Sequence, residues 1–121
     1  MKSIMHDKGS RTCFLCMKLH KDYSQKYYLE EHHVINGTAN RKLSEKYGLK
    51  VYLCPSHHRT SDEAVHMNQE IALMLKEQAQ IQFENTYPNL SFREIFGKNY
   101  REEKEEMNKF IGEGRLTREP E

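Results

Sequence analysis

The pattern of apolar and polar positions predicts two short strands early in the chain. β-forming residues over 27–35 indicate one strand, and alternation over 49–53 indicates a second. Asn36-Gly37, just after the first of these segments, is a strong turn signal. Residues 38–48 are polar and basic and end in Gly48, and we expect them to form the loop that joins the strands.

Helical patterns follow the second strand. Pro55 suits the first turn of a helix, which would carry His57 and His58. Farther along, apolar residues recur at helical spacing and predict a helix that Pro88 ends. This apolar stripe comprises Ile71, Met74, Leu75, Ala79 and Phe83.

The end of the chain is predicted to remain helical. Ser91 and Glu94 have the spacing of a capping box, which predicts a short helix that Gly97 ends. We expect residues 101–112 to form a charged helix and residues 113–121 to be frayed.

Composition limits the size of the core. Of 121 residues, 36% are hydrophobic and 31% are charged, and there is no Trp, so we expect one domain whose core needs a metal ion. Residues 1–12 are polar and are expected to be loose. No segment has the pattern of a membrane helix or a signal peptide, which predicts a cytoplasmic protein without a membrane partner. Thiols stay reduced there, which favours metal binding over disulfides.

The cysteines predict a structural zinc site. Cys13 and Cys16 are separated by two residues, and so are Cys54 and His57. That gap lets one tight turn direct two ligands at the same ion, and zinc prefers four thiolate and imidazole ligands. The set uses all three cysteines of the chain. His20 is the alternative to His57 as fourth ligand, and burial of the cysteines as small apolar residues is the alternative to zinc.

Two histidine pairs predict a second metal site. Phosphodiester hydrolysis needs an activated water and a group that stabilises charge at the phosphate. We expect His33 to be the general base, because a histidine can accept a proton at neutral pH. His32 and His58 are the expected ligands of a catalytic Mg²⁺ or Mn²⁺ ion, and His66 is a further candidate.

Local geometry decides which metal site each histidine of a pair can reach. Neighbours on a helix point about 100° apart, so His57 is expected to face the cysteines while His58 faces the second site. In a regular strand His32 and His33 would face opposite sides. Both belong to one site only if the strand ends or bulges there.

Charge is concentrated between the histidine pairs. The chain has a formal charge of +1, which gives no overall basic field. Residues 37–60 nevertheless carry four excess positive charges. We expect four of these residues to contact DNA, namely Arg41, Lys42, Lys46 and Arg59. A solvated surface segment is the alternative.

These motifs resemble those of the HNH (ββα-metal) endonucleases. The similar segments are the Cys-x-x-Cys pair, residues 31–35 (Glu-His-His-Val-Ile) and residues 53–59 (Leu-Cys-Pro-Ser-His-His-Arg). The doubled histidines are similar to those of small phage and prophage members. The resemblance implies an α+β fold, with a ββα-metal core and zinc knuckle over residues 11–66. A helical extension over residues 67–121 would pack on this core.

The resemblance also implies roles for individual residues. It places a metal ligand at His32, where the family usually has Asp, the catalytic base at His33 and the helix ligand at His58. The family's middle Asn, which tethers the loop through backbone hydrogen bonds, has no counterpart within residues 41–50. Asn40 and Ser44 are the candidate substitutes.

The expected function is therefore a metal-dependent DNA endonuclease of phage or mobile-element origin, acting in recombination or DNA processing. The alternative is a catalytically weak zinc module that binds DNA or a recombination partner. A third possibility is a zinc-stabilised interaction domain with no role on nucleic acid. A homodimer and phage recombination proteins are the other partners considered.

Overall fold

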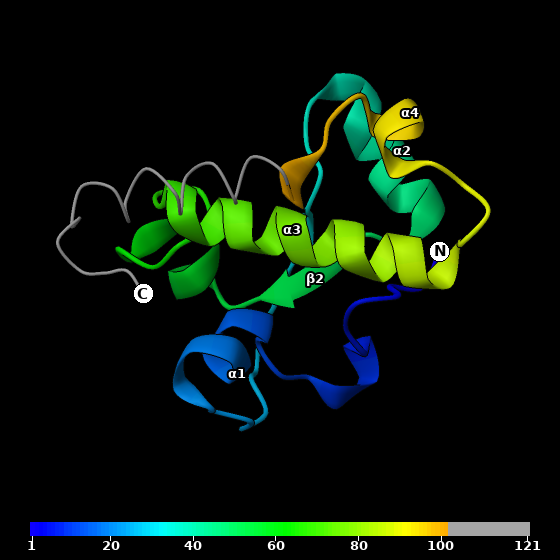
Figure 1. Cartoon of the computed structure of the whole chain (residues 1–121). Helices are drawn as coiled ribbons and strands as arrows, with labels where there is room; N and C mark the ends of the chain where they lie inside the picture. The colour runs from blue at the N-terminus through cyan, green and yellow to red at the C-terminus, as the bar shows by residue number, and fades with distance from the viewer. Residues whose placement is uncertain (102–121) are drawn as a thin grey trace, which may run out of the picture.

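The computed structural model describes residues 1–101 as a mixed α+β fold around a two-stranded antiparallel sheet (Figure 1). This confirms the predicted α+β class. The helices are η1 (Lys8–Ser10), α1 (Phe14–His20), α2 (Thr38–Tyr47), η2 (Ser56–Thr60), α3 (Gln69–Thr86) and α4 (Phe92–Phe96), and the strands are β1 (Glu30–His33) and β2 (Lys50–Leu53). The helix expected over residues 101–112 and the frayed end over 113–121 lie outside the described residues, apart from Arg101.

The sheet is shorter than the sequence suggested. β1 pairs with β2 in a register that places Glu30 opposite Leu53 and His33 opposite Lys50. The predicted second strand is confirmed to within one residue, whereas the first begins three residues later than predicted. Tyr27 is fully exposed. Its high strand propensity has no effect here, because its side chain does not pack against a sheet.

The predicted loop over residues 38–48 is wrong in part, because most of it forms helix α2. Gly48 ends this helix in the left-handed conformation, with φ of 76°, as suits a helix C-cap. The Tyr47 ring packs against Phe83, Tyr87 and Phe96, at centroid distances of 5.3, 5.4 and 6.2 Å. The helix is therefore held by contacts from the C-terminal helices, and its own sequence contains too few apolar residues to show a clear helical stripe.

The prediction that residues 1–12 are loose is also wrong, because this segment packs along the outer edge of β2. The backbone N–H of Ile4 donates to the carbonyl of Gly48 at 2.9 Å. The backbone N–H of Tyr52 donates to Nδ1 of the buried His6 at 3.0 Å. Burial lowers the pKa of His6, which favours the neutral ring that such a bond requires. The segment covers a strand edge that would otherwise expose unpaired backbone groups.

Helices α3 and α4 confirm their sequence signals. Asn68 caps α3, and three members of the apolar stripe, Leu75, Ala79 and Phe83, are fully buried. Ser91 caps α4 and accepts a hydrogen bond from the backbone N–H of Glu94, as the capping box predicted. In the view of Figure 1, α3 crosses in front of β2, and α4 lies beside α2, where Tyr47 packs against Phe96. Among residues 1–101, no helix combines the length and apolar character that crossing a membrane requires.

Candidate metal centres

Three cysteines and His57 form a compact cluster. Nδ1 of His57 lies 3.7 Å from Sγ of Cys13, 3.3 Å from Sγ of Cys16 and 3.6 Å from Sγ of Cys54. Sγ of Cys16 lies 3.9 Å from Sγ of Cys54. A tetrahedral zinc ion with ordinary bond lengths would have S–S edges of about 3.8 Å and S–N edges of about 3.6 Å. The four residues can therefore hold a metal ion such as zinc.

The local chain directions explain this arrangement. Cys13 is the N-cap of α1, and its sulfur accepts the backbone N–H of Cys16 at 3.4 Å. Cys54 follows β2, and the single turn of η2 brings His57 back towards it. Burial first, and then the neighbouring sulfurs of Cys13 and Cys54, raise the pKa of Cys16 to about 12. A sulfur with so high a pKa stays a thiol at neutral pH unless a cation lies beside it, and a bound metal ion would supply that cation.

Glu63 resolves the choice between the two candidate fourth ligands. Its Oε1 lies 3.0 Å from Nε2 of His57 and 2.6 Å from Nε2 of His20. Because a carboxylate accepts hydrogen bonds, Nε2 of His57 carries the proton and Nδ1 presents its lone pair to the cysteines. His20 stacks on the outer side of the His57 ring, with centroids 5.7 Å apart. His57 completes the cluster and His20 does not.

A second cluster contains three histidines. Nε2 of His58 and Nε2 of His66 lie 3.1 Å apart, and the His32 ring lies 5.2 Å from each of the other two rings. One nitrogen from each ring falls within 4.8 Å of the others, a spacing that one ion could bridge. The turn after η2 brings His66 into place, since its N–H donates to the carbonyl of His58. The predicted trio His32, His58 and His66 is thus brought together.

Burial favours the neutral form of two of these three rings. His32 is 5% exposed, and burial, followed by the charge of His58, lowers the pKa of His32 to about 3. Burial also lowers the pKa of His66. Metal ligation requires an unprotonated imidazole nitrogen, so the lowered pKa values of His32 and His66 suit both rings to bind an ion at neutral pH.

Glu30 orients His58 and also changes the expected role of Arg59. Its Oε1 lies 2.6 Å from Nδ1 of His58, which leaves Nε2 free to face His66. Arg59 donates to both carboxylate oxygens of Glu30, at 3.1 and 2.6 Å. Arg59, followed by His58, holds the pKa of Glu30 at about 2. The guanidinium predicted to contact DNA is therefore engaged within the protein.

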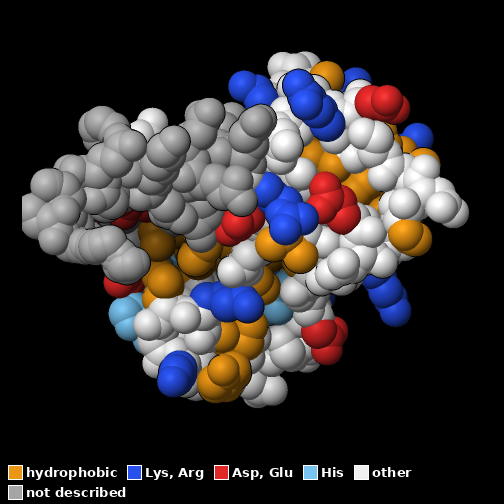
Figure 2. Space-filling view, in the orientation of Figure 1, with side chains coloured by type: hydrophobic (Ala, Val, Ile, Leu, Met, Phe, Trp, Pro, Cys, Tyr) orange, Lys and Arg blue, Asp and Glu red, His pale blue; other side chains and the backbone are white. Residues whose placement is uncertain are grey.

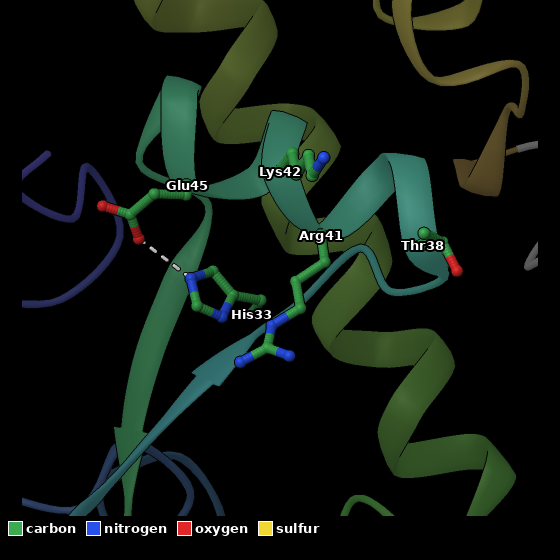
Figure 3. A pocket seen from close by; sticks show the side chains of 5 residues that line it. All are labelled: His33, Thr38, Arg41, Lys42 and Glu45. Carbon is green, nitrogen blue, oxygen red and sulfur yellow. Dashed lines mark hydrogen bonds and ion pairs between the residues drawn. The ribbon is translucent and has the colours of Figure 1, made fainter.

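His33 lies apart from the three-histidine cluster, as strand alternation would suggest. Its Nε2 donates to Oε1 of Glu45 on α2 at 2.9 Å (Figure 3). Glu31, His33 and Glu45 also have the spacing of metal ligands. The ammonium of Lys50, however, lies 3.0 Å from Glu31 and 3.0 Å from Glu45. A buried lysine already neutralises these two carboxylates, so this third group needs no metal ion.

Two cavities meet at His33. One, of about 260 Å³, is lined by Glu31, His32, His33, Asn36, Arg41, His58 and His66. The other, of about 590 Å³, is lined by His33, Thr38, Arg41, Lys42 and Glu45 (Figure 3). Both histidines of the first pair therefore reach one cavity although they belong to different clusters. Of the other predicted DNA contacts, Arg41 lines both cavities and Lys42 lines the larger one, and both are exposed. Lys46 is also exposed but lines neither cavity, and its ammonium lies 5.3 Å from the Tyr47 ring centroid.

Ser44 joins α2 to the end of β1. Its buried hydroxyl donates to the carbonyl of Ile35 at 2.7 Å and accepts the N–H of Ile35 at 3.1 Å. Of the two residues considered as substitutes for a tethering Asn, Ser44 makes the two backbone contacts. Asn40 instead donates to the carbonyl of Phe96 at 3.4 Å.

Sequence reasoning missed the carboxylates that orient the histidines. Glu30 is 28 residues from His58, and Glu45 is 12 residues from His33. Neither separation corresponds to a repeat along one helix or strand, so no local pattern could reveal these pairs.

On the face shown in Figure 2, basic and acidic side chains are interspersed over the described surface. Comparison with protein-family models, with curated proteins and with solved structures gives no match to this chain.

Proposed function

We propose that this protein is a metal-dependent DNA endonuclease of the HNH type, whose structural zinc is held by the cysteine cluster. One observation carries the proposal: a single cavity is lined by His32, His58 and His66, which can share an ion, and by His33, which is not needed to bind that ion. Arg41 lines the same cavity and offers a cation for a phosphate group.

The proposed division of labour follows from these positions. His33 would take a proton from the attacking water, since its Nε2 is occupied by Glu45 and its Nδ1 is the remaining acceptor. An ion held by the three histidines would polarise the phosphate and stabilise the leaving oxygen. Arg41 and Lys42 would hold the phosphate backbone over α2.

The ligand atoms of the three-histidine cluster indicate which metal ion it would bind. Magnesium prefers oxygen ligands, whereas imidazole nitrogens suit zinc, nickel and iron. The sequence led us to expect Mg²⁺ or Mn²⁺ at this site, but three imidazoles favour a softer first-row ion such as Zn²⁺ or Ni²⁺. Cleavage assays therefore include Zn²⁺ and Ni²⁺ alongside Mg²⁺ and Mn²⁺.

The test is cleavage of supercoiled plasmid and of branched DNA by the zinc-loaded protein with each ion in turn. We expect nicking by the wild type and a loss of at least about 100-fold in His33→Ala, because general-base catalysis contributes about 10²- to 10⁴-fold. His20→Ala is the matched control, since His20 lies against the cysteine cluster and lines neither cavity at His33. Intact DNA with every ion, or equal cleavage by wild type and His33→Ala, would reject the proposal.

A second candidate function is a zinc module that binds DNA, or a recombination partner, without cutting. Within this candidate, the engagement of Arg59 by Glu30 and the burial of Lys50 favour a protein partner over DNA, because both reduce the positive charge available to DNA. Salt-dependent DNA binding without cleavage, unchanged in His33→Ala, would support this candidate over the first. Phage origin, a homodimer and recombination partners stay predictions from the sequence.

A further inference from the structure

Glu45 and His33 form a pair within the larger cavity. His33 projects from β1 and Glu45 from α2, and Figure 3 shows the Nε2 edge of the imidazole turned towards the carboxylate. The two atoms are 2.9 Å apart, and the His33 side chain is only 13% exposed. The other ring nitrogen faces away from Glu45.

This contact determines which nitrogen of the neutral ring carries the proton. An ionised carboxylate can only accept hydrogen bonds, so the proton of His33 must reside on Nε2 and the lone pair on Nδ1. Hydrogen bonds from His33, from the terminal amine and from Lys50 hold the pKa of Glu45 at about 2. Glu45 is therefore a carboxylate at neutral pH.

Buried neighbours fix Glu45 in place. Nζ of Lys50 lies 3.0 Å from Oε1 and 3.2 Å from Oε2 of Glu45, and Lys50 is itself buried. The adjacent Ser44 bonds both backbone groups of Ile35, which holds α2 against the end of β1. The distance between Glu45 and His33 is thus set by the packing of two elements.

We propose that Glu45 is a positioning residue that holds His33 in the Nε2–H form and stabilises the imidazolium created during DNA cleavage. This rests on the proposed function. In that step the O–H bond of the attacking water breaks and its proton passes to Nδ1 of His33. The water oxygen bonds to phosphorus as the bond from phosphorus to the leaving oxygen breaks. The leaving oxygen becomes a hydroxyl with a proton from solvent, and His33 later returns its proton to solvent.

The experiment compares Glu45→Gln with Glu31→Gln in the zinc-loaded protein. Each variant removes one carboxylate from the ion pair with Lys50, but only Glu45→Gln removes the carboxylate that contacts His33. We expect Glu45→Gln to lose at least as much stability as Glu31→Gln on urea unfolding, because Glu45 also pairs with the terminal amine and with His33. We expect kcat to fall at least about tenfold further in Glu45→Gln than in Glu31→Gln, with KM little changed, because an orienting carboxylate acts on the chemical step.

A second measurement does not depend on cleavage. ¹⁵N NMR of histidine-labelled protein, with the His33 signals assigned from His33→Ala, reports which ring nitrogen carries the proton at pH 8. We expect Nε2–H in the wild type and in Glu31→Gln, and a mixture of both forms in Glu45→Gln.

The outcomes separate this inference from the proposed function. An Nδ1–H ring in the wild type, or equal loss of kcat in the two variants, overturns the role of Glu45. If the wild type cuts no DNA, the proposed function fails and NMR alone decides whether Glu45 positions the ring. An Nε2–H form that is lost only in Glu45→Gln then supports positioning, and any other result overturns it.

Discussion

The two candidate metal clusters differ although they use neighbouring residues of one helical turn. His57 turns inward to three sulfurs, and Cys13 and His57 are 0% and 6% exposed. His58 turns to two other imidazoles beside a cavity, and His66 is exposed. The first set has four donors and is closed, as structural zinc sites are, whereas the second has three donors, so an ion held there would keep a fourth position open.

In both clusters, a carboxylate determines which nitrogen of the histidine ring faces the other ligands. Glu63 binds Nε2 of His57, so Nδ1 faces the sulfurs, whereas Glu30 binds Nδ1 of His58, so Nε2 faces His66. Adjacent histidines thus offer opposite nitrogens to different clusters. A single turn can serve two sites because each ring has its own acidic partner.

The largest expected effect is at the closed cluster. Cys54→Ser should release zinc and unfold much of the domain, because structural zinc contributes about 10–16 kcal/mol in zinc-finger peptides, as much as a whole domain's net stability. Metal analysis and circular dichroism test this. A Cys54→Ser protein that keeps the wild-type melting temperature, or a wild type equally stable in strong chelator, would show that the cluster is not a structural zinc site.

The next largest effect is an expected difference between variants of the neighbouring residues His57 and His58. His57→Ala should destabilise the protein much as a cysteine variant does, whereas His58→Ala should keep the fold and lose the second ion. The wild type is expected to bind two ions per chain and His58→Ala one, with excess metal partly restoring the second. Calorimetric metal titration and thermal unfolding measure both properties. Equal losses of stability and of metal in the two variants would contradict the division.

A smaller effect concerns pH and the open cluster. The pKa of His32 is about 3 in the folded protein, against an ordinary value of 6.5, so the unfolded chain binds more protons between these values. Stability should therefore fall as pH drops below about 6.5, with His32 contributing up to roughly 1.4 kcal/mol per pH unit. Urea unfolding from pH 7 to pH 5, without added second metal, should show a weaker dependence in His32→Asn. Both proteins contain the cysteine cluster, so a difference between them comes from residue 32. If the free energy of unfolding depends on pH equally in the wild type and in His32→Asn, the lowered pKa assigned to His32 is wrong.

The smallest expected effect is at Arg59. The Arg59 side chain is half exposed, so Arg59→Ala should change the free energy of unfolding little. The salt dependence of DNA binding should change less than in Arg41→Ala, because Arg41 lies exposed at both cavities. Filter binding at several salt concentrations compares the two. A larger change in Arg59→Ala would mean that DNA displaces Glu30 from the guanidinium.

The sequence by itself determined the features that depend on short spacings. The two-residue gaps predicted the cysteine cluster, because one turn places both ligands on the same side. The helical stripe ending at Phe83 and the cap at Ser91 predicted α3 and α4, since a repeat of 3.6 residues and a side chain bonded to a nearby N–H are local properties.

Only the tertiary structure decided the features that depend on partners far along the chain. α2 forms where the sequence suggested a loop because Tyr47 packs against the C-terminal helices. Arg59 is paired rather than free because β1 places Glu30 beside it. His33 meets Glu45 because α2 packs against the end of β1, whereas strand alternation, a local property, already turned its ring away from His32. Packing and charge pairing between distant segments depend on the three-dimensional arrangement, and no periodicity in the chain encodes them.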